Sequence, residues 1–153
     1  MLINNAGVLT RETLDALDFD AVRRQFEVNA LGPLRVVNAL AENLGRGSKV
    51  GIVTSRMGSI GDNASGRMYS YRMSKAAANM LGVNLYHELR PRGVCVMLLH
   101  PGTVATQMTR GAKNWDQMTK PAEAAAGLAA QLDALTPDTP IEFRHADGSL
   151  LPW

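Results

Sequence analysis

The distribution of apolar residues along the chain predicts short strands separated by long helices. Two near-continuous apolar runs, "KVGIVTS" at 49–55 and "GVCVMLLH" at 93–100, are typical of strands that are covered on both faces. A shorter run, "LIN", follows the first methionine, and a weaker strand pattern, "PIEFRH", occupies 140–145. We therefore expect four strands.

Helical periodicity fills the intervals between these runs. Apolar residues recur at helical spacing from 19 to 40, with Asp18 or Asp20 as the candidate N-cap and Gly45 as the candidate end. Further helical patterns cover 68–91 and 121–135. The alternation of strands and helices predicts an α/β fold with a mostly parallel sheet. In such sheets ligands bind at the carboxyl ends of the strands, which directs attention to "NNAG", "TSRMGS", "YSYRMSK" and "HPGTVATQM".

Composition excludes several classes of function. The chain has 153 residues, a length that suits a single domain, and a net charge of only +2, without the dense basic cluster of a nucleic-acid-binding protein. No apolar run is long enough to span a bilayer. The single cysteine, Cys95, excludes an intrachain disulfide and is expected to be buried and inert, while His87, His100 and His145 lack the spacing of metal ligands. We expect a cytoplasmic protein without a metal, a membrane or a nucleic-acid partner.

A candidate proton-transfer group lies at the start of the helix at 68–91. Tyr71 and Lys75 are four residues apart, so both side chains project from one helix face. A lysine ammonium favours the tyrosinate and would lower the tyrosine pKa towards neutrality. Ser55, at the end of the second strand, could bond the same substrate oxygen. Taken alone, the Tyr–Lys spacing is more typical of an ordinary amphipathic pair, with the tyrosine at the core edge and the lysine in water.

Five motifs in order give this pair a context. They are "NNAG", "FEVNALGPL", "GIVTSRMGS", "YRMSK" and "HPGTVATQM". With these motifs the chain resembles the short-chain dehydrogenases/reductases. Within that family it is most similar to the C-factor and sniffer-like carbonyl reductases, through "DGSLLPW", "GSIGDN" and "YRMSKAAANM". The segment "TPDTPIEFRH" departs from those relatives, since it lacks the glycine that they often place before the last strand.

The resemblance implies a site, residue by residue. Its catalytic residues would be Asn29, Ser55, Tyr71 and Lys75. Its cofactor-binding residues would be Asn5, Ala6, Gly7, Tyr71, Lys75, Pro101, Gly102, Val104 and Thr106. The cofactor would be NADP or NAD, with NADP favoured, and the substrate a small carbonyl compound or alcohol. Asn29 would help to hold a water chain towards Lys75 that resupplies the proton; the alternative is an exposed polar residue of a helix.

The resemblance also implies a Rossmann-like parallel sheet with flanking helices, of which residues 1–153 form the C-terminal, second half of a doubly wound fold. We expect a single, N-terminally truncated domain, because nothing in the sequence reads as a strand followed by a Gly-rich phosphate turn. Two functions remain open. One is a nicotinamide-dependent oxidoreductase with Tyr71 as proton donor. The other is a catalytically dead family member that acts as an oligomerising or regulatory partner. Homo-oligomers could form through the two long helices or the exposed sheet edge.

Residues beside the motifs suggest what borders the substrate. Met57, Met68 and Met108 flank the catalytic stretches and could line an apolar pocket, although methionine is more often a core filler. Trp115 lies where the family keeps a substrate lid, and it could equally cover the core.

Overall fold

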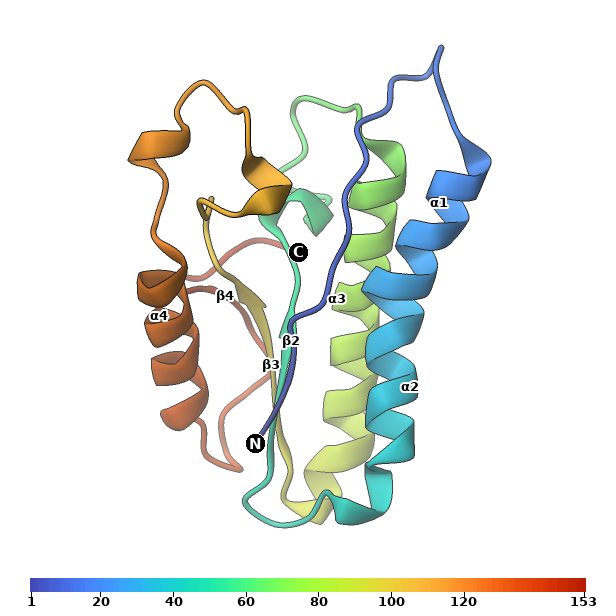
Figure 1. Ribbon diagram of the computed structural model, residues 1–153. Helices are drawn as coiled ribbons and strands as arrows, with labels where there is room; N and C mark the ends of the chain where they lie inside the picture. The colour runs from blue at the N-terminus through green and yellow to red at the C-terminus, as the bar shows by residue number, and fades with distance from the viewer.

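The computed structural model describes all of residues 1–153 and confirms an α/β fold. The four strands are parallel and hydrogen-bonded in the order β1-β2-β3-β4. Helices α1, α2 and α3 cover one face of the sheet and α4 covers the other (Figure 1). The elements in chain order are β1 (Leu2–Asn4), α1 (Phe19–Phe26), α2 (Gly32–Ala39), β2 (Lys49–Val53), α3 (Tyr69–Leu89), β3 (Cys95–His100), α4 (Pro121–Asp133) and β4 (Phe143–His145).

The central strands β2 and β3 are buried on both faces, as their apolar sequences predict. One face packs against α3, and its buried strand residues are Val50, Ile52, Val96 and Leu98. The other packs against α4 and contributes Val53, Cys95, Met97 and Leu99. Burial also raises the pKa of the Cys95 thiol, so this cysteine is structural, as expected.

The segment between β1 and β2 differs from the single helix expected there. Asp18 is the N-cap, as predicted, and accepts hydrogen bonds from the backbone N–H groups of Asp20 and Ala21. A π-helical segment, Glu27–Leu31, then separates α1 from α2. The expected end at Gly45 was wrong, because α2 stops at Ala39 so that the following turn can bring Leu44 into the core. Gly47, rather than Gly45, takes the left-handed conformation, with φ +83°.

Helix α3 follows its prediction closely. It begins after two left-handed residues, Arg67 and Met68, and runs for 21 residues before a 3₁₀ turn at Arg90–Arg92. No helix combines the length and apolarity needed to cross a bilayer. Strand β1 pairs with β2 alone, and Ile3 in it is 42% exposed. The expectation that β1 forms a sheet edge is confirmed within these residues.

Candidate active site

Tyr71, Lys75 and Ser55 meet at the carboxyl end of β2. Tyr71 and Lys75 lie on α3, both buried, with the Lys75 Nζ 5.8 Å from the centre of the Tyr71 ring. The Nζ donates a hydrogen bond to the backbone oxygen of Val53, 3.0 Å away. Ser55 is buried after β2, and its Oγ accepts a hydrogen bond from the backbone N–H of Met57. The lysine is therefore not the solvated half of an ordinary amphipathic pair.

The pKa of Tyr71 is shifted in the direction opposite to the expected lowering by Lys75. Burial raises the pKa of Tyr71, and a hydrogen bond with Ser55 opposes that effect. Burial also lowers the pKa of Lys75 to about 8. The expectation was wrong, because desolvation dominates at both residues. Tyr71 consequently holds its proton at neutral pH.

Asn29 is buried, and the interpretation as an exposed polar residue was wrong. The π-helical segment carries it, and its exposed fraction is 1%. Its Oδ1 accepts from the backbone N–H of Val8 at 2.8 Å, and its Nδ2 donates to the Val8 backbone oxygen at 2.9 Å and to the Ser74 Oγ at 3.0 Å. Asn29 thus ties the chain after "NNAG" to α3. Short π-helical segments within helices, like the one that carries Asn29, occur often at functional sites.

A cleft of about 790 Å³ brings most of the predicted cofactor residues together. Of the nine, it is lined by Asn5, Ala6, Gly7, Tyr71, Lys75, Pro101, Val104 and Thr106. Gly102 does not line this cleft. A Cβ atom on Gly7 would lie 3.3 Å from the Asn29 Oδ1 and 3.4 Å from the Lys75 Nζ, so the glycine leaves room at the floor of the cleft.

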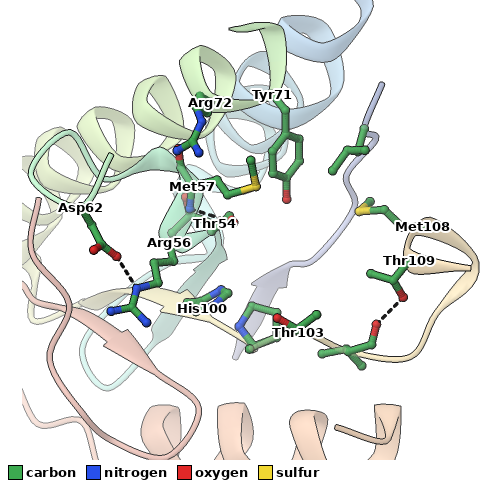
Figure 2. A pocket seen from close by; sticks show the side chains of 15 residues that line it. Thr54, Arg56, Met57, Asp62, Tyr71, Arg72, His100, Thr103, Met108 and Thr109 are labelled. Carbon is green, nitrogen blue, oxygen red and sulfur yellow. Dashed lines mark hydrogen bonds and ion pairs between the residues drawn. The ribbon is translucent and has the colours of Figure 1, made fainter. Parts of the chain in front are cut away.

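Figure 2 shows a second pocket, of about 400 Å³. Tyr71 lines both this pocket and the cleft. It contains Ser55 and Gly102, and its walls include Met57 and Met108, two of the three methionines considered for the substrate pocket. Met68, the third methionine considered, lines neither space and instead precedes α3 in the left-handed conformation. Trp115 lies on a 3₁₀ turn, is 37% exposed, and lines neither space.

Sequence reasoning missed a buried polar cluster beneath Tyr71. The Glu12 carboxylate accepts hydrogen bonds from the backbone N–H of Ser70, from its hydroxyl, and from the Gln25 amide at 3.1 Å. Burial acts to raise the pKa of Glu12, but these hydrogen bonds and one from Thr10 outweigh it and lower the pKa. Nothing in "TRETL" distinguishes this glutamate from a surface residue, because its partners are distant in the chain.

Two histidines at the ends of β3 and β4 are paired. The rings of His100 and His145 pack edge to face, with centroids 5.2 Å apart. Burial, with smaller contributions from His145 and Arg56, lowers the pKa of His100 to about 4, so that its ring is neutral at pH 7. No group of three histidine, cysteine or acidic side chains is arranged to hold a metal ion.

The sequence profile described as short chain dehydrogenase matches residues 1–117. The chain belongs to the short-chain dehydrogenase family. It is 53% identical over 148 residues to the 1-hydroxy-2-glutathionyl-2-methyl-3-butene dehydrogenase of Rhodococcus sp. (strain AD45), covering 97% of this chain and 66% of that protein. It is 41% identical to the C-signal of Myxococcus xanthus, covering 100% of this chain and 92% of that protein.

Solved structures of carbonyl reductases share the fold. The NADPH-bound enzyme from chicken fatty liver matches with a TM-score of 0.87 and 28% identity, over 99% of this chain and 65% of that one. Carbonyl reductase Sniffer of D. melanogaster matches with a TM-score of 0.88 and 25% identity, over 99% of this chain and 65% of that one. These matches confirm the Rossmann-like fold and the resemblance to sniffer-like reductases. The chain spans about two thirds of the length of the Rhodococcus dehydrogenase and of both reductases.

Proposed function

We propose that these residues form the catalytic half of a nicotinamide-dependent oxidoreductase that interconverts a carbonyl and an alcohol. The observation that carries the proposal is the position of Tyr71, which lines both the 790 Å³ cleft and the 400 Å³ pocket. A group at the boundary of two spaces can reach a substrate in one while a cofactor fills the other. The similarity to a dehydrogenase and to carbonyl reductases supports this assignment.

In the reducing direction, Tyr71 donates its proton to the carbonyl oxygen. Its raised pKa keeps it protonated at neutral pH, as an acid requires. Ser55 beside it orients the same oxygen. Asn29 positions Val8, and through it the floor of the cleft, by the three hydrogen bonds described above. A water relay towards Lys75, the role that the family implies for Asn29, would have to use the Oδ1, because both Nδ2 hydrogens are engaged.

The 790 Å³ cleft fits the nicotinamide and ribose portion of NADP or NAD. Its floor at Gly7 has no side chain, and Lys75 has donors left after bonding Val53. Asn5 and Ala6 would contact the adenosine side, and Val104 and Thr106 the carboxamide. When bound, the cofactor supplies the hydride. NADP is favoured because neighbouring structures were determined with NADPH or NADP.

Replacing Tyr71 tests the proposal. Tyr71→Phe removes the acid and keeps the ring, so NADPH-dependent aldehyde reduction should fall about 10²–10⁴-fold. Tyr69→Phe is the matched control, because Tyr69 lies two residues away, is 37% exposed and lines neither space. Turnover is measured by NADPH absorbance with saturating cofactor. A Tyr71→Phe protein that retains activity within threefold of the Tyr69→Phe protein would refute the role of Tyr71.

The second candidate function is that of a non-catalytic, oligomerising or regulatory partner. The similarity to C-signal over 92% of its length favours it, since that name denotes a signal. Its homo-oligomers would form through the long helices, where Leu34, Met73 and Met80 are exposed, or through the β1 edge. A protein that self-associates, yet neither binds NADPH or NADH in a fluorescence titration nor reduces aldehydes, would support this function over the first.

A further inference from the structure

The 400 Å³ pocket has a positive end. Its charged lining residues are Arg56, Asp62 and Arg72, which together carry one net positive charge. His100, the remaining basic residue of the lining, is neutral at pH 7. In Figure 2 Arg56, Asp62 and Arg72 lie on one side of Tyr71, and Met108 and Thr109 lie on the other. The pocket therefore has a cationic side, and no charged residue of its lining is among those labelled on the other side.

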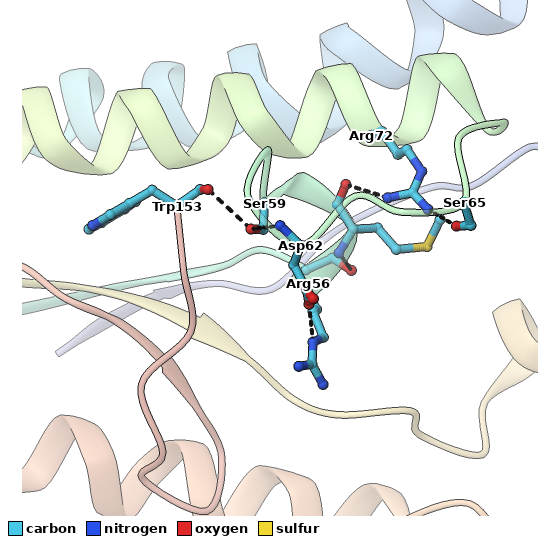
Figure 3. A network of polar contacts seen from close by, with 8 residues as sticks. Arg56, Ser59, Asp62, Ser65, Arg72 and Trp153 are labelled. Atoms are coloured by element: carbon cyan, nitrogen blue, oxygen red, sulfur yellow. Dashed lines mark hydrogen bonds and ion pairs between the residues drawn. The ribbon is translucent and has the colours of Figure 1, made fainter.

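Arg72 is held in place by neutral acceptors and forms no ion pair. Its guanidinium donates to the Ser65 Oγ at 2.9 Å (Figure 3). It also donates to the backbone oxygen of Gly66 at 3.1 Å and to the backbone oxygen of Met57 at 3.4 Å. These three bonds use three of the five guanidinium N–H groups. A positioned guanidinium with an uncompensated charge and two free donors is suited to a carboxylate.

Arg56 is the second cation of this end, and it is only partly neutralised. Its Nε is ion-paired with the Asp62 carboxylate, and its remaining donors have no partner within the chain. Asp62 is itself fixed, because its backbone N–H donates to the Ser59 Oγ, which donates to the Trp153 backbone oxygen (Figure 3). Asp62 thus lowers the positive charge of the pocket without abolishing it.

We propose that this pocket selects substrates that carry a carboxylate in addition to the carbonyl or alcohol that reacts at Tyr71. Arg72 binds the carboxylate, with Arg56 beside it, while Met57 and Met108 contact the apolar part of the substrate. This inference rests on the proposed oxidoreductase function. If Arg72 only clamped the loop at 65–66, its loss would affect acidic and neutral substrates equally.

The test compares 4-carboxybenzaldehyde with its methyl ester, which differ in charge and share the reacting aldehyde. In each reduction a hydride from NADPH forms the new C–H bond and a proton from Tyr71 forms the O–H bond, leaving the alcohol and NADP⁺. The measured quantity is the acid-to-ester ratio of kcat/KM. It should fall about tenfold in Arg72→Met, because a hydrogen bond between charged groups is lost. It should fall less in Arg72→Lys.

Asp62→Asn provides a change of opposite sign. It leaves Arg56 unpaired, so the acid-to-ester ratio should rise about threefold, an effect that a general loosening of the loop would not produce. Arg90→Met is the control for net charge. Arg90 follows the other end of α3, contacts the Tyr86 ring and lies outside the pocket, so its replacement should leave the ratio unchanged. Thermal unfolding of each variant checks that it is folded.

The outcomes separate this inference from the proposed function. Reduction of the ester at a rate equal to that of the acid, with no change of ratio in Arg72→Met, would overturn the carboxylate site and leave the oxidoreductase function standing. If neither aldehyde is reduced, binding of 4-(hydroxymethyl)benzoate and its methyl ester, followed by ligand-observed NMR, decides the question. Binding of the acid that Arg72→Met abolishes supports the site, and equal binding of acid and ester overturns it.

Discussion

Glu12 caps the helix that carries Tyr71, although it lies 58 residues away from its partner Ser70. The first residues of a helix have N–H groups without intrahelical acceptors, and Met68, at the N-cap position of α3, offers no side-chain bond. The Glu12 carboxylate instead accepts from the Ser70 backbone N–H at 3.3 Å and from the Ser70 hydroxyl. A negative charge is also favourable at the positive end of a 21-residue helix. Tyr71 directly follows Ser70 in the chain.

Replacement of Glu12 should therefore destabilise the fold and the site together. Glu12→Ala leaves the backbone N–H and the hydroxyl of Ser70 without their acceptor, and we expect a loss of about 3 kcal/mol in urea unfolding at pH 7. The Gln25 amide keeps two other acceptors, on Thr10 and Ser70. Glu12→Gln should lower the free energy of unfolding by a smaller amount. Because the folded pKa of Glu12 is lowered, its contribution is complete above the unfolded value of 4.5 and disappears as pH falls through the folded value. If the wild-type protein exceeded Glu12→Gln in free energy of unfolding by as much at pH 2 as at pH 7, this interpretation would be contradicted.

Asn29 should be essential for order at the floor of the cleft. Asn29→Ala removes three hydrogen bonds and leaves both backbone groups of Val8 without a partner, at a cost of about 2–4 kcal/mol. Amide hydrogen exchange at Val8 should accelerate. Asn38→Ala is the control, because Asn38 is an exposed residue of α2. Equal stability of the two variants would show that Asn29 does not anchor this segment.

Gly58 permits the close approach of Ser55 and α3. A Cβ atom at this position would lie 2.7 Å from the backbone carbonyl carbon of Lys75, which cannot move aside. Gly58→Ala should cost about 1–3 kcal/mol and lower activity by separating Ser55 from Tyr71. Gly45→Ala is the matched control, since nothing lies within 4 Å of its added Cβ. The measurements are chemical unfolding and turnover, and a Gly58→Ala protein as stable and active as Gly45→Ala would refute the contact.

Lys75 should make stability rise with pH in an alkaline window. Its folded pKa of about 8 lies below the reference value of 10.5, so the folded chain binds fewer protons than the unfolded chain between these values. The free energy of unfolding should therefore increase as pH rises from about 8 to 10, by up to about 3 kcal/mol. Below pH 8 the cost of burying the charge is present in full. Lys75→Met should lack this slope, and an identical slope in both proteins would exclude Lys75 as its source.

A polypeptide of residues 1–153 should self-associate, and two substitutions identify the surface. In it β1 has one hydrogen-bonded neighbour, and open strand edges pair readily. Ile3 in β1 and Leu34 in α2 are equally exposed, at 42%. Size-exclusion chromatography should show that Ile3→Lys dissociates an edge-paired dimer, whereas Leu34→Lys dissociates a dimer formed through the helices. A monomer at all concentrations would contradict both interfaces.

Local patterns in the sequence predicted the strands, the helix α3 and the α/β class. The apolar runs at β2 and β3 predicted strands buried on both faces, and the periodicity of α3 placed Tyr71 and Lys75 on one helix face, because these patterns depend on residues that are near one another in the chain. Three of the five motifs likewise supplied the nine residues proposed for the cofactor, and eight of these nine line one cleft. Each of these inferences required only local spacing or motif order.

Features that depend on residues distant in the chain are visible only in the folded protein. The contact of Glu12 with Ser70, the pairing of His100 with His145 and the bonds of Asn29 to Val8 all join separate segments. The pKa of Tyr71 was also decided there. The sequence showed a cation four residues away, but only the folded chain shows that desolvation of the buried phenol outweighs any lowering of its pKa by that cation. Burial is a property of all the elements packed around a residue, and no local pattern contains it.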